Sequence, residues 1–382
     1  MRDPVYPVFC ALGAVLTVLP LPWHWKARNA GTLIYVGWAF SACIVFLVNS
    51  LVWAGNTNDT APIWCDISSR FVIALSIGLP ASSLCVQRRL YRIAAMKDIS
   101  TLGYTMKKKQ LIIDLMIGIG FPFVVIALHY VVQPARYMII EDIGCWPTET
   151  NMILSMFMVR IWSAVVALAS FVYACLTIRL FFKTRRQFSR VLSESGADLN
   201  LSRFFRLMAL AATDMSFSLP LSLYFFIVNL MFYPIRPWIS WTETHKHINE
   251  VWVTSYEEQL LVPGLKTSFD LNRWSIPGCA FLFFMFFGLS SEAIEQYRDV
   301  FWRVANLFGI KRPEPTPKSP TTSWTRRMMS STKHTDTTFV RTEHTTSMAS
   351  ISNPSNSSSG RIDKPNERAS SSPYVKDLES QN

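Results

Sequence analysis

The sequence predicts an all-α membrane protein, a bundle of seven transmembrane helices followed by a disordered tail. Three observations support this prediction: long apolar spans, a biased distribution of basic residues between loops, and a composition with 50% hydrophobic and only 16% charged residues. A bilayer core needs about 20 apolar residues per helix, which most of the spans supply. The seven spans cover residues 5–25, 32–54, 64–86, 111–132, 151–179, 207–231 and 274–289.

The loops between the spans predict the orientation of the chain. The loops after spans one, three and five hold fifteen Lys and Arg residues, whereas the loops after spans two, four and six hold four. The positive-inside rule places the basic loops in the cytosol and the N-terminus outside, and the odd number of spans places the C-terminus inside. The net charge of +11 then fits cytosolic loops facing anionic lipid and acidic partners, rather than nucleic acid.

The first three spans carry distinct local signals. Span one lacks the small-residue cleavage site of a signal peptide, so we expect it to act as its own insertion signal. Its inner end combines Pro20 and Pro22 with Trp23 and Trp25, and aromatic rings suit the headgroup level. Span two carries no charged residue. Span three contains Pro80, which we expect to kink it.

The later spans continue the pattern. Span four follows a run of three lysines, span five continues into a basic stretch, span six contains Pro220, and the short span seven is strongly aromatic. The third outer loop, residues 232–272, is the longest, and we expect it to form a cap. Residues 1–308 should form the helical domain. The tail, residues 309–382, is rich in Ser and Thr and should be disordered, because it has too few aliphatic residues to form a core.

Two cysteines lie on the outer side of the predicted bundle. Cys65 stands at the outer end of span three, and Cys145 lies in the second outer loop. An extracellular face is oxidising, so this pair can form a disulfide; the alternative is two free thiols too far apart to react. The other five cysteines fall inside apolar spans and are interpreted as small core residues.

Ionisable residues inside the spans are candidates for function, because a charge in lipid is costly. Arg160 lies about two turns from the outer side and Asp214 about two turns from the cytosol. For both, function and structural pairing remain equally open. Asp66 and Arg70 are four residues apart and can pair on one helix face. The full set is Asp66, Arg70, Asp114, His129, Arg160 and Asp214.

Several function classes are disfavoured by missing motifs. The chain has no His-Glu-x-x-His run, no Gly-x-Ser-x-Gly turn and no phosphate-binding glycine loop, so we expect no enzyme, cofactor or metal. No lysine lies inside any span, which excludes a retinal Schiff base. No inverted repeat is apparent, which weakens a transporter interpretation.

Short segments along the chain together resemble a known family. They are Leu19–Asn29, Ile63–Ile67, Pro80–Cys85 with Arg88–Tyr91, His129–Tyr137, Glu141–Cys145, Arg203–Met208, Leu219–Ser222 and, more weakly, Phe286–Gly288. In their order and topological placement they resemble the fungal mating-pheromone receptors that recognise lipopeptides, the a-factor receptor type of class D G-protein-coupled receptors. The style of the sequence resembles that of basidiomycete members.

The resemblance implies a plasma-membrane receptor. Its ligand would be a short peptide pheromone ending in a farnesylated, methylated cysteine, and its partner the α subunit of a heterotrimeric G protein. A farnesyl chain gives only reversible membrane affinity, so the ligand could arrive from the outer leaflet or from water. No nucleic acid partner is expected, and a homo-oligomer is left open.

Candidate site residues follow from their expected position. Activation is expected to bend span six at Pro220, near Asp214, relative to spans three and five. Candidates for G-protein coupling are the cytosolic arginines Arg88, Arg89, Arg185, Arg186, Arg203 and Arg206. Candidates for ligand binding lie at the outer ends of the spans and in the outer loops: Trp64, Asp66, Arg70, His129, Arg136, Tyr137, Glu141, Asp142, Trp146 and Arg160.

The chain departs from rhodopsin-like receptors at two places. Span three ends in Gln87-Arg88-Arg89 rather than Asp-Arg-Tyr, and span seven lacks an Asn-Pro-x-x-Tyr sequence. The switches of that class therefore cannot be transferred to this chain. The alternative function is a seven-helix transporter in which Arg160 and Asp214 form a polar relay.

Overall fold

The computed structural model describes most of the first 309 residues. The chain separates into two compact units, Met1–Arg312 and Pro313–Asn382, and only the first contains described residues. The predicted tail therefore lies, apart from Gly309, outside the described part of the chain. The described ranges are residues 3–26, 28–95, 104–194, 201–232, 235–261 and 264–309.

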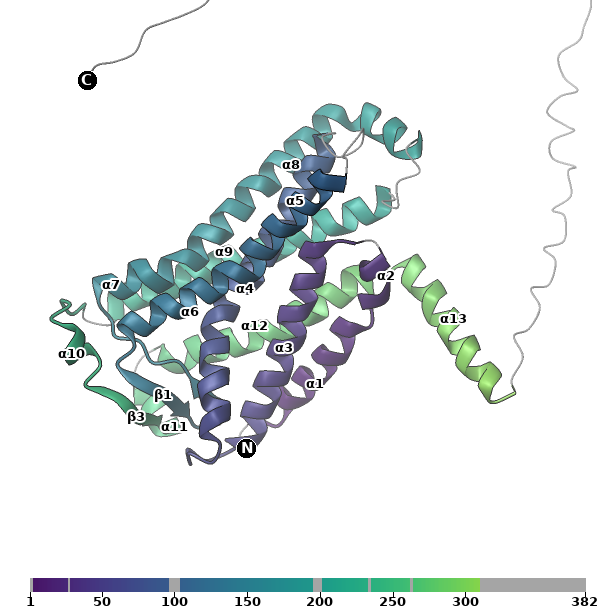
Figure 1. Ribbon diagram of the computed structural model, residues 1–382. Helices are drawn as coiled ribbons and strands as arrows, with labels where there is room; N and C mark the ends of the chain where they lie inside the picture. The colour runs from purple at the N-terminus through teal and green to yellow at the C-terminus, as the bar shows by residue number, and fades with distance from the viewer. Residues whose placement is uncertain are drawn as a thin grey trace, which may run out of the picture. The chain divides into compact units, whose positions relative to one another are not determined.

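The described chain is mostly helical, with one small sheet (Figure 1). Two helices contain short π-helical segments, Met116–Gly120 and Met156–Arg160. The strands are β1 (Ala135–Ile140), β2 (Gly144–Trp146) and β3 (His247–Thr254). The α-helices are α1 (Val5–Val18), α2 (Leu21–Lys26), α3 (Ala30–Val52), α4 (Pro62–Ala94), α5 (Tyr104–Leu115), α6 (Phe121–Val132), α7 (Ile153–Ser155), α8 (Ile161–Glu194), α9 (Leu201–Phe232), α10 (Trp241–Thr244), α11 (Tyr256–Leu261), α12 (Leu265–Phe287) and α13 (Ser291–Leu307).

Helix occupies most of every predicted span, but several ends differ from the prediction. The first span is broken between α1 and α2, at the start of its Pro20 and Pro22 segment. Helix α12 begins at Leu265 rather than near residue 274, so the third outer loop is shorter than predicted. The first turns of α12 carry Lys266 and Asp270, which are four residues apart and form an ion pair that stabilises the helix. These charges lower the hydropathy of the first turns, so hydropathy does not mark them as part of a span.

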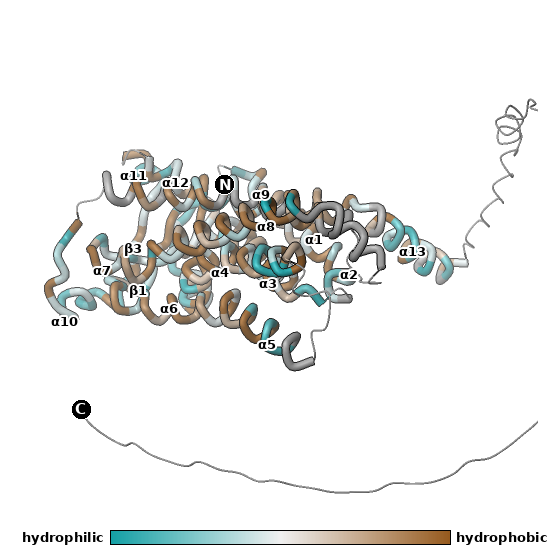
Figure 2. The backbone as a smooth tube through the Cα atoms, turned by 90° about the horizontal axis from the view of Figure 1, so that it is seen from above, coloured by the Kyte–Doolittle hydropathy of each residue, from teal (hydrophilic) through white to brown (hydrophobic). Residues whose placement is uncertain are grey.

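Four described helical stretches are long and apolar enough to cross a bilayer. Their bounds are Ala30–Val52, Pro62–Ala94, Lys108–Val132 and Ile153–Lys183. Helix α1 is a shorter apolar helix. Several helical segments expose large apolar side chains, among them Leu12, Phe123 and Phe157, as expected of surfaces that face lipid. Brown, hydrophobic stretches accordingly run along much of these helices in Figure 2. A count of seven crossings stays a prediction.

Helix α4 lies at the centre of the packing. It contacts α3, α6, α8 and α9, while α12 contacts α1, α3 and α9. The buried face of α4 is rich in small residues, such as Ser68, Ala74, Ala81 and Ser82. Small side chains let helix backbones approach closely, which is a common basis of helix packing in lipid.

Trp38 of α3 ties three segments together. Its ring lies over Gly78 of α4, where an added Cβ would be 2.4 Å from ring atom Cε2. Its indole N–H donates to the carbonyl oxygen of Gly118, 2.9 Å away, in the first π-helical segment. A substitution at Gly78 would therefore displace the ring and this hydrogen bond.

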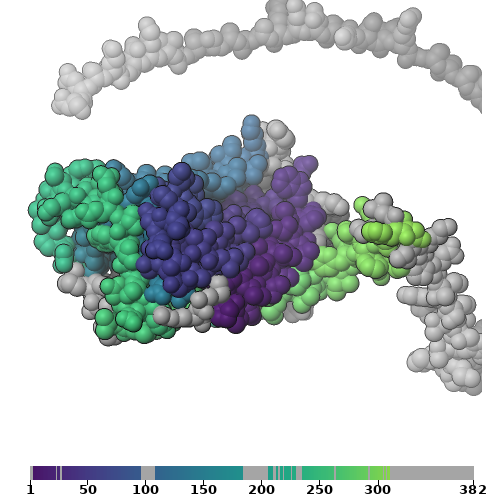
Figure 3. Space-filling view, turned by 90° about the horizontal axis from the view of Figure 1, so that it is seen from below, coloured from purple at the N-terminus to yellow at the C-terminus, as the bar shows by residue number. Residues whose placement is uncertain are grey.

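The sheet joins two loops that are distant in sequence. Its strand order is β2-β1-β3, with β1 antiparallel to β2 and parallel to β3. Strand β3 comes from the third predicted outer loop and pairs Val251 with Tyr137, after an irregularity near Ala135. Figure 3 shows residues 235–261 gathered at one end of the molecule, and α13 extends from the other. The end with the sheet is called the sheet end below.

The opposite end of α4 is called the basic end, because it carries Arg88 and Arg89. Helix α4 begins beside the sheet and runs 33 residues to Ala94. At 1.5 Å per residue, Arg88 lies about 35 Å along the helix axis from Cys65. The two ends therefore present well-separated sets of candidate residues.

Candidate functional site

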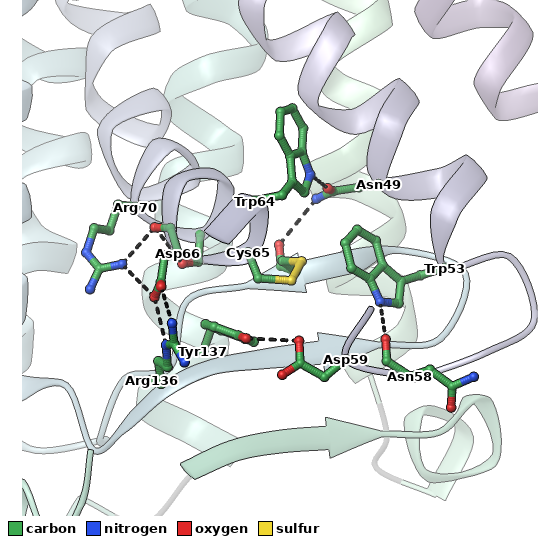
Figure 4. Close-up of a disulfide and its surroundings, with 12 residues drawn as sticks. Asn49, Trp53, Asn58, Asp59, Trp64, Cys65, Asp66, Arg70, Arg136 and Tyr137 are labelled. Atoms are coloured by element: carbon green, nitrogen blue, oxygen red, sulfur yellow. Dashed lines mark hydrogen bonds and ion pairs between the residues drawn. A yellow bond between two sulfur atoms is a disulfide. The ribbon is translucent and has the colours of Figure 1, made fainter. Parts of the chain in front are cut away.

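A disulfide joins α4 to the β1–β2 hairpin at the sheet end. Cys65 and Cys145 are bonded, with Cα atoms 5.1 Å apart, and neither is exposed (Figure 4). The two are 80 residues apart in the chain. Closing a loop of this length restricts the unfolded chain and is worth about 4 kcal/mol in the chain-entropy model.

A buried cluster surrounds the disulfide. Trp53 and Tyr137 are fully buried against it. The Tyr137 hydroxyl donates to Asp59 Oδ1 at 3.0 Å, and the Trp53 indole donates to the carbonyl of Asn58 at 2.9 Å. Burial, reinforced by the hydrogen bond to Asp59, raises the pKa of Tyr137 to about 12. Tyr137, a candidate ligand contact from sequence, thus lies inside the scaffold.

Asp66 is the centre of an ion network at the same end. Arg136 of β1 donates two hydrogen bonds to the Asp66 carboxylate, from Nε to Oδ1 at 3.1 Å and from Nη2 to Oδ2 at 2.5 Å. Arg70, one turn along α4, adds a contact from Nη1 to Oδ1 at 3.2 Å. The Asp66–Arg70 pair was expected from the spacing, but Arg136 makes the bidentate contact. The carboxylate raises the pKa of Arg136 above its ordinary value, so this guanidinium stays charged.

This network borders a pocket of about 490 Å³. The guanidinium groups of Arg70 and Arg136 have more N–H donors than the Asp66 carboxylate can bond. The lining of the pocket thus includes two positively charged side chains and one negatively charged one. It is therefore suited to groups rich in acceptor oxygen, such as carbonyls, esters or carboxylates. The lining residues are Asp66, Arg70, Tyr130, Gln133, Arg136, Ile248 and Asn249.

Three aromatic residues that were candidates for ligand binding make contacts within the fold. The Trp64 indole donates to Asn49 Oδ1 at 2.7 Å, and Asn49 in turn donates to the Cys145 carbonyl at 3.4 Å. Trp146 packs edge-on against Phe269, with ring centroids 5.3 Å apart. His129 is buried, and its Nε2 lies 2.9 Å from the Thr148 carbonyl, so Nε2 carries the proton.

Glu141 and Asp142 hold the neighbouring loops. Glu141 Oε2 accepts from the backbone N–H of Tyr256 at 2.8 Å, at the start of α11. Asp142 has a positive φ of 66°, and its Oδ1 accepts from the backbone N–H of Gly55 at 2.9 Å. Both carboxylates therefore have structural partners.

Arg160 pairs with the loop that precedes its helix. Its Nε lies 3.0 Å from Glu149 Oε1, and its Nη1 lies 3.3 Å from Asn151 Oδ1. Burial raises the pKa of the Glu149 carboxyl, and the Arg160 charge opposes that shift. Asp214, the other member of the proposed relay, has a side chain outside the described part of the structure. Of the two interpretations left open for Arg160, the contacts support structural pairing.

Ion pairs and hydrogen bonds also hold the basic end. Arg88 Nη2 lies 2.5 Å from Asp114 Oδ1, and both side chains are largely buried. Arg89 Nη1 donates to the carbonyl of Arg28 at 2.8 Å, which ties α4 to the turn before α3. Pro220 is an exposed residue inside α9.

Other candidates at the basic end are described only in part. Arg206 is half-buried on α9. The side chains of Arg185, Arg186 and Arg203 lie outside the described part, although their backbones are helical.

A comparison with protein families decides the class of the chain. The model of the STE3 family, described as pheromone A receptor, matches residues 5–307, which run from the first residue of α1 to the last residue of α13. The chain belongs to the pheromone A receptor family. The site at the sheet end, which contains the disulfide, therefore belongs to a member of this family.

The chain matches individual family members over different shares of their length. The Pheromone B alpha 1 receptor of Schizophyllum commune is 38% identical over 328 residues, 84% of this chain and 50% of that protein. Pheromone receptor 1 of Ustilago hordei is 34% identical over 317 residues, 83% and 88% respectively. The Pheromone a factor receptor of Saccharomyces cerevisiae is 27% identical over 295 residues. The chain thus spans about half the length of its Schizophyllum relatives.

One further polar cluster, around Arg273, was not predicted from the sequence. Arg273 of α12 is buried, and its guanidinium lies 3.0 Å from Asp3, 2.9 Å from Asp270 and over the Tyr6 ring, 4.8 Å from its centroid. It joins α12 to the N-terminal segment. Arg273 stands one residue before the predicted span seven, so it is not among the ionisable residues inside the spans.

Proposed function

We propose that this chain is a seven-helix plasma-membrane receptor that binds a farnesylated peptide pheromone outside the cell and activates a heterotrimeric G protein inside. The observation that supports it most is the match to the pheromone A receptor family over residues 5–307. The fold is compatible, because its helices pack in a closed series, α1 with α3, α3 with α4, α4 with α9, α9 with α12 and α12 with α1. The charge bias of the loops supports an outer N-terminus, which places the sheet end outside.

The pocket beside Asp66 is the proposed contact for the peptide part of the ligand. Arg70 and Arg136 line it and are both only partly buried. A C-terminal methyl ester and peptide carbonyls supply acceptor oxygens to such donors. Tyr130, half-exposed on α6, lies at the same pocket and packs near Trp241, with ring centroids 6.1 Å apart. These rings offer apolar surface to an isoprenoid.

Coupling is proposed at the basic end. Arg88 is held by Asp114 and Arg89 by the turn before α3, so an opening of these contacts would expose cations to an acidic partner. Pro220 removes a backbone donor from α9, which leaves the carbonyl one turn before it without its usual helical partner. Two residues later, Ser222 is hydrogen-bonded to Ser163 of α8 at 3.0 Å. A bend at Pro220 would move the cytosolic half of α9 while this contact holds the outer half.

A pathway reporter tests the function. The chain is expressed in yeast that lack their own pheromone receptors, together with a matching G protein α subunit, and is challenged with farnesylated peptides and their unfarnesylated counterparts. We expect a response that requires the farnesyl group. Silence across the panel with confirmed surface expression, together with no binding of labelled peptide, would contradict the proposal; solute uptake without a G protein would favour the transporter alternative.

A matched pair of variants tests the pocket. Arg136→Gln removes the bidentate contact to Asp66 and should weaken the response to pheromone by roughly tenfold, the equivalent of about 1.4 kcal/mol. Arg236→Gln changes an exposed arginine at the same end that does not line the pocket, and should leave potency unchanged. Equal potency of the two variants at equal surface expression would exclude the pocket as the peptide contact.

The hinge is tested separately. Pro220→Leu restores the missing backbone donor and should stiffen α9, lowering the maximal response while peptide binding persists. If basal and stimulated signalling both stay at the level of the unsubstituted chain, the hinge is discarded.

A further inference from the structure

Strand β3 lies at the edge of the three-stranded sheet. Among the described residues the strand order is β2-β1-β3, so β3 pairs with β1 and with no other strand of the described chain. Figure 4 shows β3, in pale green, running beside β1 in the same direction. The edge of β3 that faces away from β1 is called the free edge below. Backbone groups on such an edge are a ready template for pairing with another segment.

The register of the sheet identifies the backbone groups on the free edge. The carbonyl oxygen of Thr254 accepts a hydrogen bond from the N–H of Glu141, 3.0 Å away, so Thr254 turns its backbone groups towards β1. Successive residues of a strand alternate in this respect. The N–H and C=O groups of Val251 and Val253 therefore point to the free edge. No residue of the described chain forms a hydrogen bond with them.

This part of the free edge lacks the features that keep edge strands from pairing. Edge strands are usually protected by lysine or other charges, by proline or by a bulge. Residues 251–254 have the sequence Val-Trp-Val-Thr, without charge or proline. Trp252 and Val253 are 39% and 51% exposed, and as neighbours in a strand they lie on opposite faces of the sheet. A segment paired with this edge would therefore meet an apolar side chain on each face.

The free edge is continuous with the pocket described above. Strand β3 advances four residues, from His247 to Val251, while β1 advances only two. The extra residues of β3 form a bulge at the pocket, which Ile248 and Asn249 line. At about 3.3 Å per residue, Val253 lies within roughly 13 Å of Asn249 along the strand. One extended segment can thus occupy the pocket and the free edge together.

We propose that the extended peptide part of the pheromone pairs with the free edge of β3 as an additional strand. The inference rests on the proposed function, in which the C-terminal ester of the ligand occupies the pocket. The pocket lies at the N-terminal half of β3, so a ligand held there by its C-terminus runs antiparallel to β3. Its backbone exchanges hydrogen bonds with Val251 and Val253, as in other complexes in which a peptide adds a strand to a sheet.

The small size of the free edge favours a peptide over a second copy of the chain. Val251 and Val253 together offer two N–H and two C=O groups, whereas a stable protein–protein interface buries more than about 1,000 Å². A pheromone needs less from this edge, because its ester and its isoprenoid are held elsewhere. Backbone pairing accepts any extended sequence, so discrimination between peptides falls to the side chains beside the edge, Trp252 and Val253.

A pair of variants at one position tests the pairing. Val253→Pro removes the outward N–H and keeps the hydrogen bonds to β1, since proline is tolerated where the N–H faces away from the sheet. Val253→Ala removes apolar side-chain atoms and keeps the N–H. The probe is a pool of farnesylated peptide methyl esters of varied sequence, from which the members that bind the unsubstituted chain in nanodiscs are taken. We expect Val253→Pro to bind these members roughly tenfold more weakly than Val253→Ala, because a peptide carbonyl loses its partner.

Methylation of the peptide backbone gives a second measurement that needs no substitution in the chain. A methyl group on a backbone nitrogen blocks its hydrogen bond, and in a paired strand only alternate residues bond to the partner. We expect N-methylation to weaken binding at every second position of the segment next to the ester, and to change it little at the positions between. Where thermal unfolding shows that Val253→Pro does not fold, this pattern alone decides.

The remaining outcomes separate the alternatives. Peptides that bind Val253→Pro and Val253→Ala equally, or that respond equally to methylation at successive positions, refute the pairing and leave the proposed function standing. If Val253→Pro also changes the oligomeric state of the chain in detergent while binding of the peptides is equal, the free edge pairs two copies instead. Failure of the whole pool to bind the unsubstituted chain at normal expression refutes the proposed function, and this inference with it.

Discussion

The two ends of the helices are held together by different chemistry. At the sheet end, a disulfide, a three-stranded sheet and a buried aromatic cluster fix two loops to α4. At the basic end, the described contacts of α4 include the Arg88–Asp114 ion pair and the hydrogen bond from Arg89 to Arg28. Covalent and fully buried contacts do not open on the timescale of signalling, whereas ion pairs and hydrogen bonds can exchange partners.

This difference predicts how variants at each end should behave. Damage to the disulfide or to the buried aromatic cluster of the sheet end should reduce the amount of folded protein, because these contacts hold the scaffold. Under the proposed function, damage at the basic end should change the signal given by each folded molecule, because activation is proposed to open the contacts of Arg88 and Arg89. The predictions below test this division, from the largest expected effect to the smallest.

Removing the disulfide should have the largest effect. Cys65→Ser with Cys145→Ser releases an 80-residue loop and should cost about 4 kcal/mol of stability. We expect severe loss of surface expression and of thermal stability in detergent. Cys175→Ser, at a free and exposed cysteine, is the matched control and should change neither. Normal expression of the double variant would mean that the sheet end is held by its noncovalent contacts alone.

Breaking the ion pair at the basic end should come next. Asp114→Asn leaves Arg88 largely buried without its charge partner, and loss of one partner of a buried pair costs about 3 kcal/mol. We expect raised basal signalling per receptor at the cell surface, measured without pheromone. The double variant Arg88→Gln with Asp114→Asn should recover much of the lost thermal stability, because no uncompensated charge remains. Unchanged basal signalling in Asp114→Asn would remove this pair from the activation step.

The contrast between these two sites also shows what the sequence could predict. The Cys65–Cys145 pairing followed from compartment and topology, and the Asp66–Arg70 pair from helical spacing. Arg136 on Asp66 and Glu149 on Arg160 did not follow, because each joins a helix to a loop whose path only the folded chain determines. Hydropathy found the middle of each long helix and misplaced the ends where charges lie.

Helix α12, whose start was misplaced, and helix α13, which was not predicted, illustrate the same limit. The start of α12 contains Lys266, Asp270 and Arg273, which pair with one another and with Asp3. Hydropathy assigns such charged residues to a loop, although their ion pairs stabilise the helix. Helix α13 has a balanced composition, and only its 3.6-residue period marks it. Local pattern predicts that a helix exists; which residues it contacts depends on partners far away in the chain.

The Asp66 network should show a smaller effect, because its members are partly exposed. A double-mutant cycle with Asp66→Asn and Arg136→Gln should give a coupling energy of about 1 kcal/mol, measured by thermal unfolding in detergent. The corresponding cycle with Arg70→Gln should give less, because Arg70 makes one contact of 3.2 Å to the carboxylate. A larger coupling for Arg70 than for Arg136 would mean that the network is dominated by the helix pair rather than by the link to the sheet.

An effect no larger than this is expected at Tyr137. Tyr137→Phe keeps the buried ring and removes the hydrogen bond to Asp59, which should cost about 1 kcal/mol. The folded-state pKa of Tyr137 is about 12, above the ordinary value of 10.0, so the neutral hydroxyl is favoured in the fold. The stabilisation that the neutral Tyr137 hydroxyl gives to the fold is fully present below pH 10 and is lost as the pH rises towards 12. The unsubstituted chain should therefore lose more stability than Tyr137→Phe between pH 10 and 12, as measured by thermal unfolding. Parallel curves for the two proteins would show that Tyr137 stabilises the sheet end through ring packing alone, and the hydroxyl would then be dispensable to the scaffold.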